Sequence, residues 1–411
     1  MLLTTYVQST MVRDHQSYDK VSVKKGMTDL CGSLVSQATC GIFTLVILNV
    51  IFYGIYWRPM RNKDQTCSMN DVLVAATKYL QENGEISLEN TIKEACTVSS
   101  LDTNKIRDLK YVLENSIYEC NAKPLNYFPR HLDETILTLF TSWPSGERDK
   151  EGLHQNTIIN WSAFQPRINL VLFTNDSRDE QFAKERGWTV YTIVHHFAGG
   201  APVLRTMFET VMKNFNSTFY GYANGDILFA DNMIDTLSSI YTKFSAKEDI
   251  FITGRRYNVD HVSPKEAASL PNVHTVAKTR GALFEIHSED YFIASKSFPW
   301  DTVPDLVVGR PAYDNWIVAH ARCINATVID TTDTLTAVHQ TTEKGNKESL
   351  KRATPAFNDN LILKLKLPRN YESGFITCPE WKSYETLCGA IDFYRREHLP
   401  DYCQCPKSKL S

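Results

Sequence analysis

Apolar and polar positions follow two patterns beyond the first third of the chain. Short apolar runs have the length of strands, and between them apolar residues recur at helical spacing. The runs predict strands over residues 134–143, 167–176, 188–194, 219–226 and 249–256. The spacing predicts helices over residues 179–187, 201–215 and 230–244. We expect Gly187 to end the first helix and Pro202 to lie in the first turn of the second. Apolar strands that alternate with helices predict an α/β domain, with a Rossmann-like, mostly parallel sheet and helices on both faces.

Polar residues follow the predicted strands at their carboxyl ends. Sheets of this kind bind ligands at that edge, because the ends of the parallel strands meet there. The polar positions are Ser142, Asn175, Asp176, His195, His196, Asn224, Asp226, Arg255 and Arg256. The pattern therefore predicts a binding site at the carboxyl edge of the sheet.

A different pattern occurs near the N-terminus. Residues 40–57 carry no charge, which is long enough for a helix that spans a bilayer, and Trp57 at the end suits an interfacial aromatic belt. The alternative, a buried core helix, is uncommon for an uncharged run of this length. No small-residue cleavage site follows, so we expect an uncleaved signal-anchor at residues 37–57 after a cytosolic tail at residues 1–36.

Basic residues flank this segment on both sides and do not set its orientation. Two other features do. N-glycosylation sequons follow the segment at Asn160, Asn175, Asn216 and Asn325. Eight cysteines also follow it: Cys67, Cys96, Cys120, Cys323, Cys378, Cys388, Cys403 and Cys405. An even number of cysteines favours disulfides in an oxidising compartment, whereas a zinc site would need another spacing than that of Cys403 and Cys405. We therefore expect the bulk of the chain in the secretory lumen.

The organisation of the predicted luminal part has three sections. Helical spacing predicts a stem over residues 58–130, the main domain covers residues 131–367, and residues 368–411 form a cysteine-rich, disulfide-bound extension. The formal net charge of −3 argues against a nucleic-acid partner, which usually requires a basic excess.

Asp226 is the first candidate for chemistry. It follows a buried strand, and Gly225 leaves room for its carboxylate to approach a divalent cation and a phosphate. The plainer alternative, a turn aspartate bonded to its own backbone, is favoured by the local sequence alone. Arg255 and Arg256 end the next strand and suit bidentate phosphate contacts, although a solvated pair at a strand end is equally compatible.

Asp314 and His339 are candidates from later segments. Asp314 begins a predicted helix, where it can cap the helix, act as a general base, or do both. His339 stands where an apolar stretch turns polar, so it is either a second metal ligand or a hydrogen-bonded histidine at a strand end. Glu289 and Asp290 lie beside aromatic residues and suit sugar hydroxyls, but surface charges give the same pattern.

The segments "YANGDILF", "ITGRRYNVD", "SEDYFIASKSF", "GRPAYDNWIV" and "TLTAVHQ" together carry a resemblance. Their order and spacing over residues 131–345 resemble GT-A-type glycosyltransferase-like proteins. In those proteins a strand ends in an Asn/Asp-containing motif, followed by Gly-Arg-Arg, Asp-Tyr-Phe, Asp-Asn-Trp and Val-His-Gln segments. The resemblance implies a GT-A fold and a transferase of the hexosyl or N-acetylhexosaminyl type that uses a nucleotide-sugar.

The resemblance also implies roles for individual residues. Asp226 matches the last acidic position of the Asp-x-Asp motif that binds Mn²⁺ or Mg²⁺ and the nucleotide diphosphate, while Asn224 stands where the first Asp would be. His339 matches a late histidine that completes the metal site. Asp314 matches the acidic residue that deprotonates the acceptor, which implies an inverting mechanism by analogy.

These roles combine into one expected mechanism. The nucleotide base lies near Thr141 and the Asn175–Asp176 pair, and Arg255 or Arg256 assists the cation at the diphosphate. The acceptor is a glycan or glycoconjugate, and the layout resembles single-pass type II transferases of the Golgi or ER membrane. Asn224 favours an alternative, an inactive GT-A-like domain that binds glycans or a protein partner. A nucleotidyltransferase is disfavoured, because "TSWPSGERDKEG" lacks a glycine-rich basic loop after the first strand.

Overall fold

The computed structural model of the chain describes residues 135–143, 150–244, 249–341, 354–386 and 389–406. The predicted tail, signal-anchor and stem lie outside the described residues, as do Cys67, Cys96, Cys120 and Cys388. Within the described ranges, none of the helices has both the length and the apolar character needed to cross a membrane.

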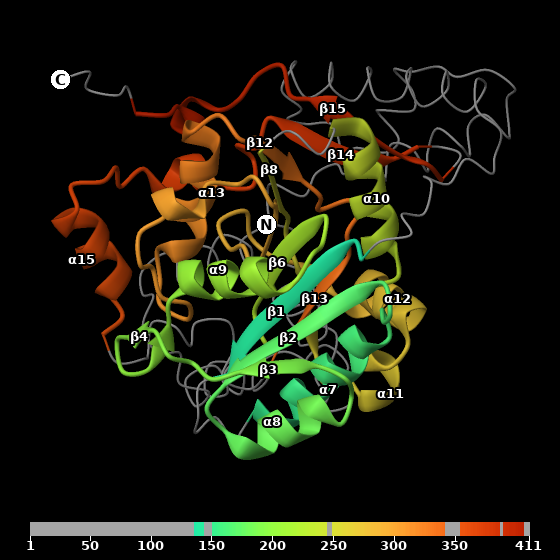
Figure 1. Ribbon diagram of the computed structural model, residues 1–411. Coiled ribbons are helices and arrows are strands. Elements are labelled where there is room, and N and C mark those ends of the chain that lie inside the picture. Colours follow the sequence, from blue (N-terminus) through green and yellow to red (C-terminus); the bar gives the residue numbers. More distant parts are fainter. Residues whose placement is uncertain (1–134, 144–149, 245–248, 342–353, 387–388, 407–411) are drawn as a thin grey trace, which may run out of the picture. The chain divides into compact units, whose positions relative to one another are not determined.

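A nine-stranded sheet forms the centre of the described part (Figure 1). Its order is β15-β14-β12-β8-β11-β6-β1-β2-β3. The strands are β1 (Leu137–Trp143), β2 (Ile168–Thr174), β3 (Thr189–Tyr191), β6 (Phe219–Ala223), β8 (Ile250–Thr253), β11 (Tyr291–Ser295), β12 (Thr327–Asp330), β14 (Trp381–Glu385) and β15 (Ile391–Arg395). Only β11 and β15 run antiparallel to their neighbours in this sheet. The predicted mostly parallel α/β sheet is confirmed.

Helices alternate with these strands. They are α7 (Glu151–Ser162), α8 (Ser177–Lys184), α9 (Leu204–Asn214), α10 (Asn232–Phe244), α11 (Pro264–Ala267), α12 (Leu270–Arg280), α13 (Tyr313–Cys323) and α15 (Phe357–Lys364), with 3₁₀ turns at Trp300–Thr302, Tyr371–Gly374 and Asp401–Cys403. Gly187 follows α8 with a φ of 79°, as a helix stop requires. The prediction for Pro202 is wrong, because this residue pairs with His196 in a two-stranded ribbon of β4 (His196–Phe197) and β5 (Ala201–Pro202) before α9 begins.

The sheet buries apolar side chains on both faces. In β1, Leu137 and Leu139 join a core with α7 and α10, whereas Phe140 points to the opposite core with α9 and α13. Successive side chains of a strand point to opposite faces, so a strand that is apolar throughout needs a cover on each side. The expected helices on both faces are therefore present (Figure 1).

A second, four-stranded sheet was not expected from the sequence. It has the order β10-β9-β13-β7 and consists of β7 (Ile227–Phe229), β9 (Tyr257–Asp260), β10 (Ala282–Leu283) and β13 (Ala337–Thr341). Three strands of the large sheet, β6, β8 and β12, are each followed in the chain by a strand of this small sheet. The strand predicted over residues 219–226 is present as β6, but it ends earlier, at Ala223, where the chain turns into β7.

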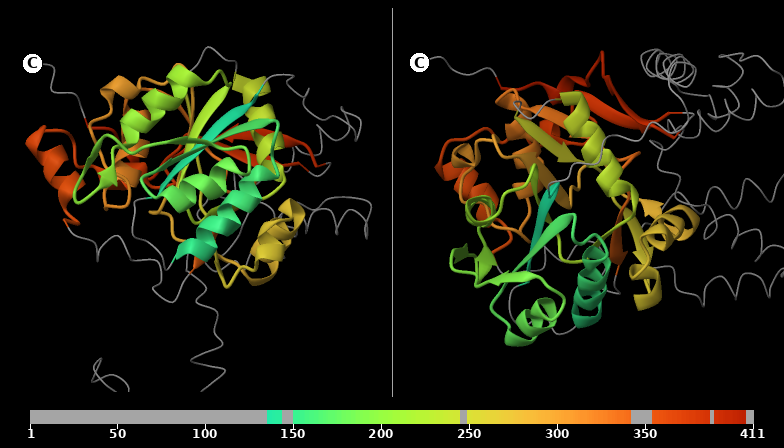
Figure 2. Two further views of the ribbon diagram at one scale, coloured as in Figure 1. Left: turned by 60° about the horizontal axis from the view of Figure 1, so that its bottom comes forward. Right: turned by 45° about the vertical axis from the view of Figure 1, so that its right-hand side comes forward.

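The C-terminal extension contributes more than a disulfide-bound cover. Its antiparallel pair β14–β15 extends the large sheet beside β12, and Figure 2 shows these red strands next to α10. Two disulfides, Cys323–Cys405 and Cys378–Cys403, confirm part of the expected framework. The first of them ties the end of the chain to the last residue of α13.

Candidate functional site

The turn from Asn224 to Asp226 connects the two sheets. The indole of Trp143 lies against Gly225 so closely that a Cβ at this position would overlap the ring. Thr157 of α7 also donates a hydrogen bond of 2.8 Å to the carbonyl of Gly225. Only glycine fits between these neighbours, and the turn is held in place by β1 and α7.

Asp226 and His339 meet at this turn. The Oδ2 atom of Asp226 lies 3.4 Å from Nε2 of His339, because β13 pairs antiparallel with β7 and places His339 opposite Ile227. The side chains remain 20% and 11% exposed, so solvent reaches the pair. Among the described residues, none donates a hydrogen bond to the buried Oδ1 of Asp226, and none bonds to Nδ1 of His339. A buried carboxylate oxygen without a partner is costly unless a cation or donor binds it.

The charge state of Asp226 suits such a cation. Burial alone would raise the pKa of this carboxyl, but His339, Lys150 and Arg256 together hold the pKa well below its usual range. Asp226 is therefore ionised at neutral pH. One carboxylate and one imidazole are ligands that Mn²⁺ accepts, and the described residues contain no group of three or more metal-ligating side chains.

Asn224 has a role that its sequence position does not indicate. Its Oδ1 accepts hydrogen bonds from the hydroxyls of Tyr222 at 3.1 Å and Tyr313 at 3.2 Å, and its Nδ2 donates to Asp290 at 2.7 Å. Tyr313 is the first residue of α13, and Asp290 directly precedes β11. The amide therefore joins three elements at the site, and a carboxylate at position 224 would meet the carboxylate of Asp290.

Arg256 supplies positive charge beneath the turn. It forms a buried ion pair with Asp290, donates to Asn258 at 3.1 Å, and lies 4.4 Å from the ring centroid of Phe284. Burial lowers the pKa of Arg256 to about 10, which leaves it charged at neutral pH. Its charge contributes to the low pKa of Asp226.

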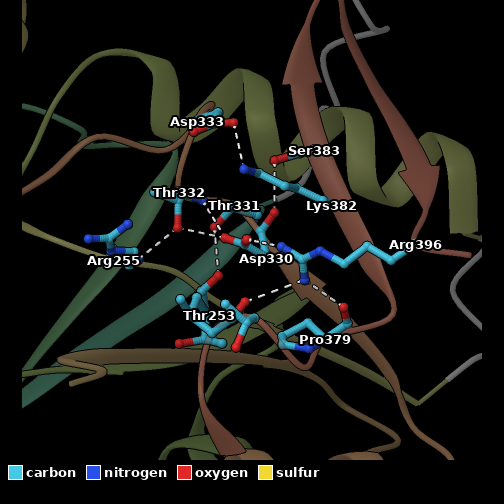
Figure 3. Close-up of polar contacts among 12 residues, drawn as sticks. Thr253, Arg255, Asp330, Thr331, Thr332, Asp333, Pro379, Lys382, Ser383 and Arg396 are labelled. Atoms are coloured by element: carbon cyan, nitrogen blue, oxygen red, sulfur yellow. Dashed lines mark hydrogen bonds and ion pairs between the residues drawn. The ribbon is translucent and has the colours of Figure 1, made fainter. Parts of the chain in front are cut away.

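Arg255 makes different contacts. Its Nε donates to the carbonyl of Phe284 at 2.6 Å, and its backbone N–H donates to Thr332 at 2.9 Å. Figure 3 shows this bond as one edge of a polar cluster around Asp330. In that cluster Asp330 accepts from Thr332 at 2.6 Å and pairs with Arg396 at 2.6 Å. Arg255 therefore holds the backbone around β8.

Asp314 lies within the first turn of α13. It is the second residue of the helix, and the cap position belongs to Ala312, whose φ is 77°. The backbone N–H of Asn315 donates to Asp314 at 3.0 Å, and burial raises the pKa of Asp314 to about 6. Such a carboxyl takes up a proton close to neutral pH, which is what a general base needs.

Glu289 lies close to Asp314. The side chain of Asn315 donates to Glu289 at 2.8 Å, and burial raises the pKa of Glu289 well above its usual range, assisted by the charge of Asp314. Glu289 is only 2% exposed. A neutral Glu289 leaves Asp314 as the group that exchanges protons at this point.

The residues expected at the nucleotide base have structural partners. Asn175 exchanges two hydrogen bonds with the backbone of Ile193, at 2.9 and 3.3 Å, and Asp176 caps α8 by accepting from the N–H of Arg178 at 3.0 Å. Thr141 is fully buried in β1, with no partner for its hydroxyl in the described part of the chain. The sheet does bring Asn224, Asp226, Arg256, Asp314 and His339 to one edge.

Gln340 is a site residue that the sequence reasoning missed. It is 1% exposed, and its side chain bonds to Asn156 at 2.9 Å and to Thr157 at 3.2 Å. Its backbone N–H donates to the carbonyl of Asp226 at 3.1 Å. The glutamine was visible beside His339, but its role depends on contacts with α7 that lie far away in the sequence.

Comparisons with known proteins add little at this point. Neither a scan of protein families nor a search of curated proteins finds a match to this sequence. Solved structures with partial likeness include S. aureus TarS in complex with UDP-GlcNAc (8% identity, TM-score 0.25, 31% of this chain and 36% of that chain). A second is CMP:2-keto-3-deoxy-manno-octonic acid synthetase with CTP (12% identity, TM-score 0.23, 39% of this chain and 74% of that chain). A third is a mycobacterial protein (9% identity, TM-score 0.28, 50% of this chain and 65% of that chain). With TM-scores this low, these likenesses carry no conclusion about function.

Proposed function

We propose that this chain is a glycosyltransferase that moves a sugar from a nucleotide-sugar to a glycan or glycoconjugate acceptor. The observation that carries the proposal is the Asp226–His339 pair at the carboxyl edge of a mostly parallel sheet. Ligands of such sheets bind at this edge, where loops replace the strands. The order of the site segments, which resembles GT-A-type proteins, supports the same reaction class.

A divalent cation fits the pair. Asp226 and His339 would hold Mn²⁺ or Mg²⁺, because an ionised carboxylate, with one oxygen that no described residue bonds, faces an imidazole. When bound, the cation would neutralise the diphosphate of the donor as it leaves. Two protein ligands suffice, since diphosphate oxygens and water can fill the other positions.

Asp314 is the proposed base. Its pKa of about 6 keeps it ionised at neutral pH, yet close enough to neutrality to accept a proton from a sugar hydroxyl. A base that deprotonates the acceptor supports direct attack on the anomeric carbon with inversion. Asn224 would position this base through its bond to Tyr313, which precedes Asp314, and Asn224 and Arg256 both bond to Asp290 just before β11.

The proposal places this reaction in the secretory lumen. The two disulfides support an oxidising compartment, and the uncharged segment at residues 37–57 would anchor the chain in the Golgi or ER membrane as a type II protein. The alternative of a non-catalytic binder depended on Asn224. Because the amide of Asn224 already satisfies three side chains, its presence no longer favours loss of activity.

A thermal-shift screen tests the proposal. Common nucleotide-sugars are added to the purified chain with and without Mn²⁺, and the midpoint of unfolding is measured. We expect one donor to raise the midpoint only when Mn²⁺ is present, since a ligand that binds the native state stabilises it. Stabilisation that persists unchanged in Asp226→Ala would exclude the proposed cation site, and no response to any donor would favour the binder.

A further inference from the structure

The four sequons differ in whether the asparagine is accessible. Asn160 is fully buried: its Nδ2 donates to the carbonyls of Phe229 at 3.1 Å and Ala267 at 3.0 Å, and its Oδ1 accepts from the N–H of Phe229 at 2.8 Å. The nitrogen that would carry a glycan is therefore committed within the core. The sequon at Asn160 is explained by packing of α7 on β7, and glycosylation there would be incompatible with this fold.

The other three asparagines are exposed, but they differ in whether the amide nitrogen donates a hydrogen bond. The Nδ2 of Asn175 donates to the carbonyl of Ile193, so a glycan there would leave this bond to the one remaining N–H of the amide. Asn216 and Asn325 are exposed, and their amide nitrogens donate to no other described residue. Among the described sequons, these two have an amide nitrogen that is both exposed and not engaged in a hydrogen bond.

Asn325 has a defined conformation. It follows α13 with a φ of 64°, in the left-handed region that often closes helices and that asparagine tolerates well. Its backbone N–H donates to the carbonyl of Arg322 at 3.0 Å. The N–H of Ala326 donates to the carbonyl of Ala321, also at 3.0 Å. The Cys323–Cys405 disulfide ties down the same helix end. The asparagine side chain is therefore presented outward from a rigid turn.

A cavity lies directly beside this asparagine. It has a volume of about 510 Å³, and Asn325 and Thr327 of the sequon line it together with Lys243, Glu380, Trp381 and Arg395. A neighbouring cavity of about 830 Å³ shares Trp381 and continues along β15. The two spaces lie at the amino ends of β12 and β14, opposite to the edge that carries Asp226.

The lining of the cavity suits a sugar. The Trp381 ring is partly exposed and is fixed by an edge-to-face contact with Phe244, at 5.1 Å between centroids. Beside it, Arg395 and Glu380 form an ion pair at 2.7 Å that is largely exposed. A flat aromatic face packs against the apolar face of a pyranose, while charged groups at the rim exchange hydrogen bonds with its hydroxyls.

We propose that Asn325 carries an N-linked glycan whose first sugars lie in this cavity against Trp381. The glycan then covers the end of α13 and the start of β14. It leaves the carboxyl edge of the sheet open, in contrast to a glycan at Asn175. This glycan requires passage of the chain through the secretory lumen, but it does not require glycosyl transfer by the chain. The glycan proposal can therefore fail while the proposed function holds, and the proposed function can fail while the glycan proposal holds.

Glycopeptide mass spectrometry of the full chain, expressed in cultured eukaryotic cells, tests the first part. We expect a glycan at Asn325 and none at Asn160. Asn325→Gly and Thr327→Ala should both remove it, since the first keeps the left-handed conformation and the second keeps the asparagine. Thr327→Ser is the matched control and should retain the glycan. An unmodified Asn325, with or without glycans elsewhere, would overturn the proposal.

A thermal cycle tests the contact with Trp381. The unfolding midpoint is measured for four proteins: the wild type, Asn325→Gly, Trp381→Ala and the double variant. We expect loss of the glycan to lower the midpoint by about 3 °C more when Trp381 is present. The backbone effect of glycine cancels in this difference. Equal changes in both backgrounds would show that the glycan does not lie against Trp381.

Discussion

Two clusters of buried charge lie at the carboxyl ends of strands in the same sheet, and they differ in whether both oxygens of the central carboxylate have a partner. Around Asp330, which ends β12, both carboxylate oxygens are bonded, one to Thr332 and the other to Arg396 (Figure 3). Around Asp226, which follows β6, the Oδ1 atom and Nδ1 of His339 have no partner among the described residues.

This difference separates structure from function. Burial would raise the pKa of Asp330, but Lys382 and Arg396 lower it, so the cluster is ionised and its charges cancel within the protein. Its partners come from β14 and β15, which it secures to the rest of the sheet. The Asp226 cluster keeps unsatisfied atoms at an accessible edge, and buried polar atoms of that kind indicate a place where a ligand completes the set.

Asp226→Asn is expected to give the largest effect on activity. The amide keeps the shape but loses the charge that would hold the cation, so donor turnover with Mn²⁺ should fall by about 10³-fold, or about 4 kcal/mol. Turnover of the donor identified by thermal shift is the measurement. The unfolding midpoint without ligand serves as the control, because a folding defect would also reduce turnover.

Asp330→Asn should give the reverse result. It leaves the buried Arg396 without its carboxylate, which should cost about 3 kcal/mol in the free energy of unfolding. Urea unfolding measures the cost. The Mn²⁺-dependent response of the folded fraction should stay unchanged, and a selective loss of that response would mean that the two clusters are not separable.

Asp314→Asn should affect both activity and stability in a pH-dependent way. Because burial raises the folded pKa from 3.8 to about 6, the ionised group costs stability above that pH. Its stabilising share is fully present below about pH 4 and is lost as the pH rises through about 6. The variant should therefore be more stable than the wild type by about 3 kcal/mol at pH 7.5, with the difference vanishing towards pH 4.

The same carboxyl should control the pH profile of transfer. The wild-type rate should fall about tenfold per pH unit below pH 6, as the base becomes protonated. Residual activity of Asp314→Asn should lack this limb. An unchanged acid limb in the variant would assign the titration to another group.

Asn224→Asp should have the smallest effect and the most informative sign. If position 224 is a weakened metal ligand, an aspartate there raises activity; if it positions Asp290 and Tyr313, the second carboxylate costs about 1–2 kcal/mol in stability and lowers activity. We expect a loss of both stability and activity, as measured by urea unfolding and turnover.

The sequence predicts the sheet and part of the site for a physical reason. Strands such as β1 and β2 are apolar throughout because both faces are covered, and this pattern is local. The turn after β6 and the helix around Asp314 are also local signals, so Asp226 and Asp314 could be named in advance. The local change from apolar to polar residues also makes His339 a candidate, and the resemblance in segment order adds its expected role at a metal site.

The remaining features depend on contacts between distant segments. The small sheet forms from short pieces such as β7 and β10, which have too few residues to show a period. The hydrogen bonds of Asn224 join residues up to 89 positions apart, and those of Gln340 join residues 184 positions apart. The buried sequon at Asn160 shows the same limit, because a local motif does not reveal whether its asparagine lies in the core.

Anomalous diffraction from crystals grown with Mn²⁺ and UDP tests the central claim most directly, because it locates the cation without reference to turnover. We predict an anomalous peak about 2.0–2.3 Å from the carboxylate of Asp226 and the imidazole of His339. The peak should be absent from Asp226→Asn crystals prepared in the same way. UDP bound at the carboxyl edge with no Mn²⁺ at these side chains, or a peak at another site, would contradict the account.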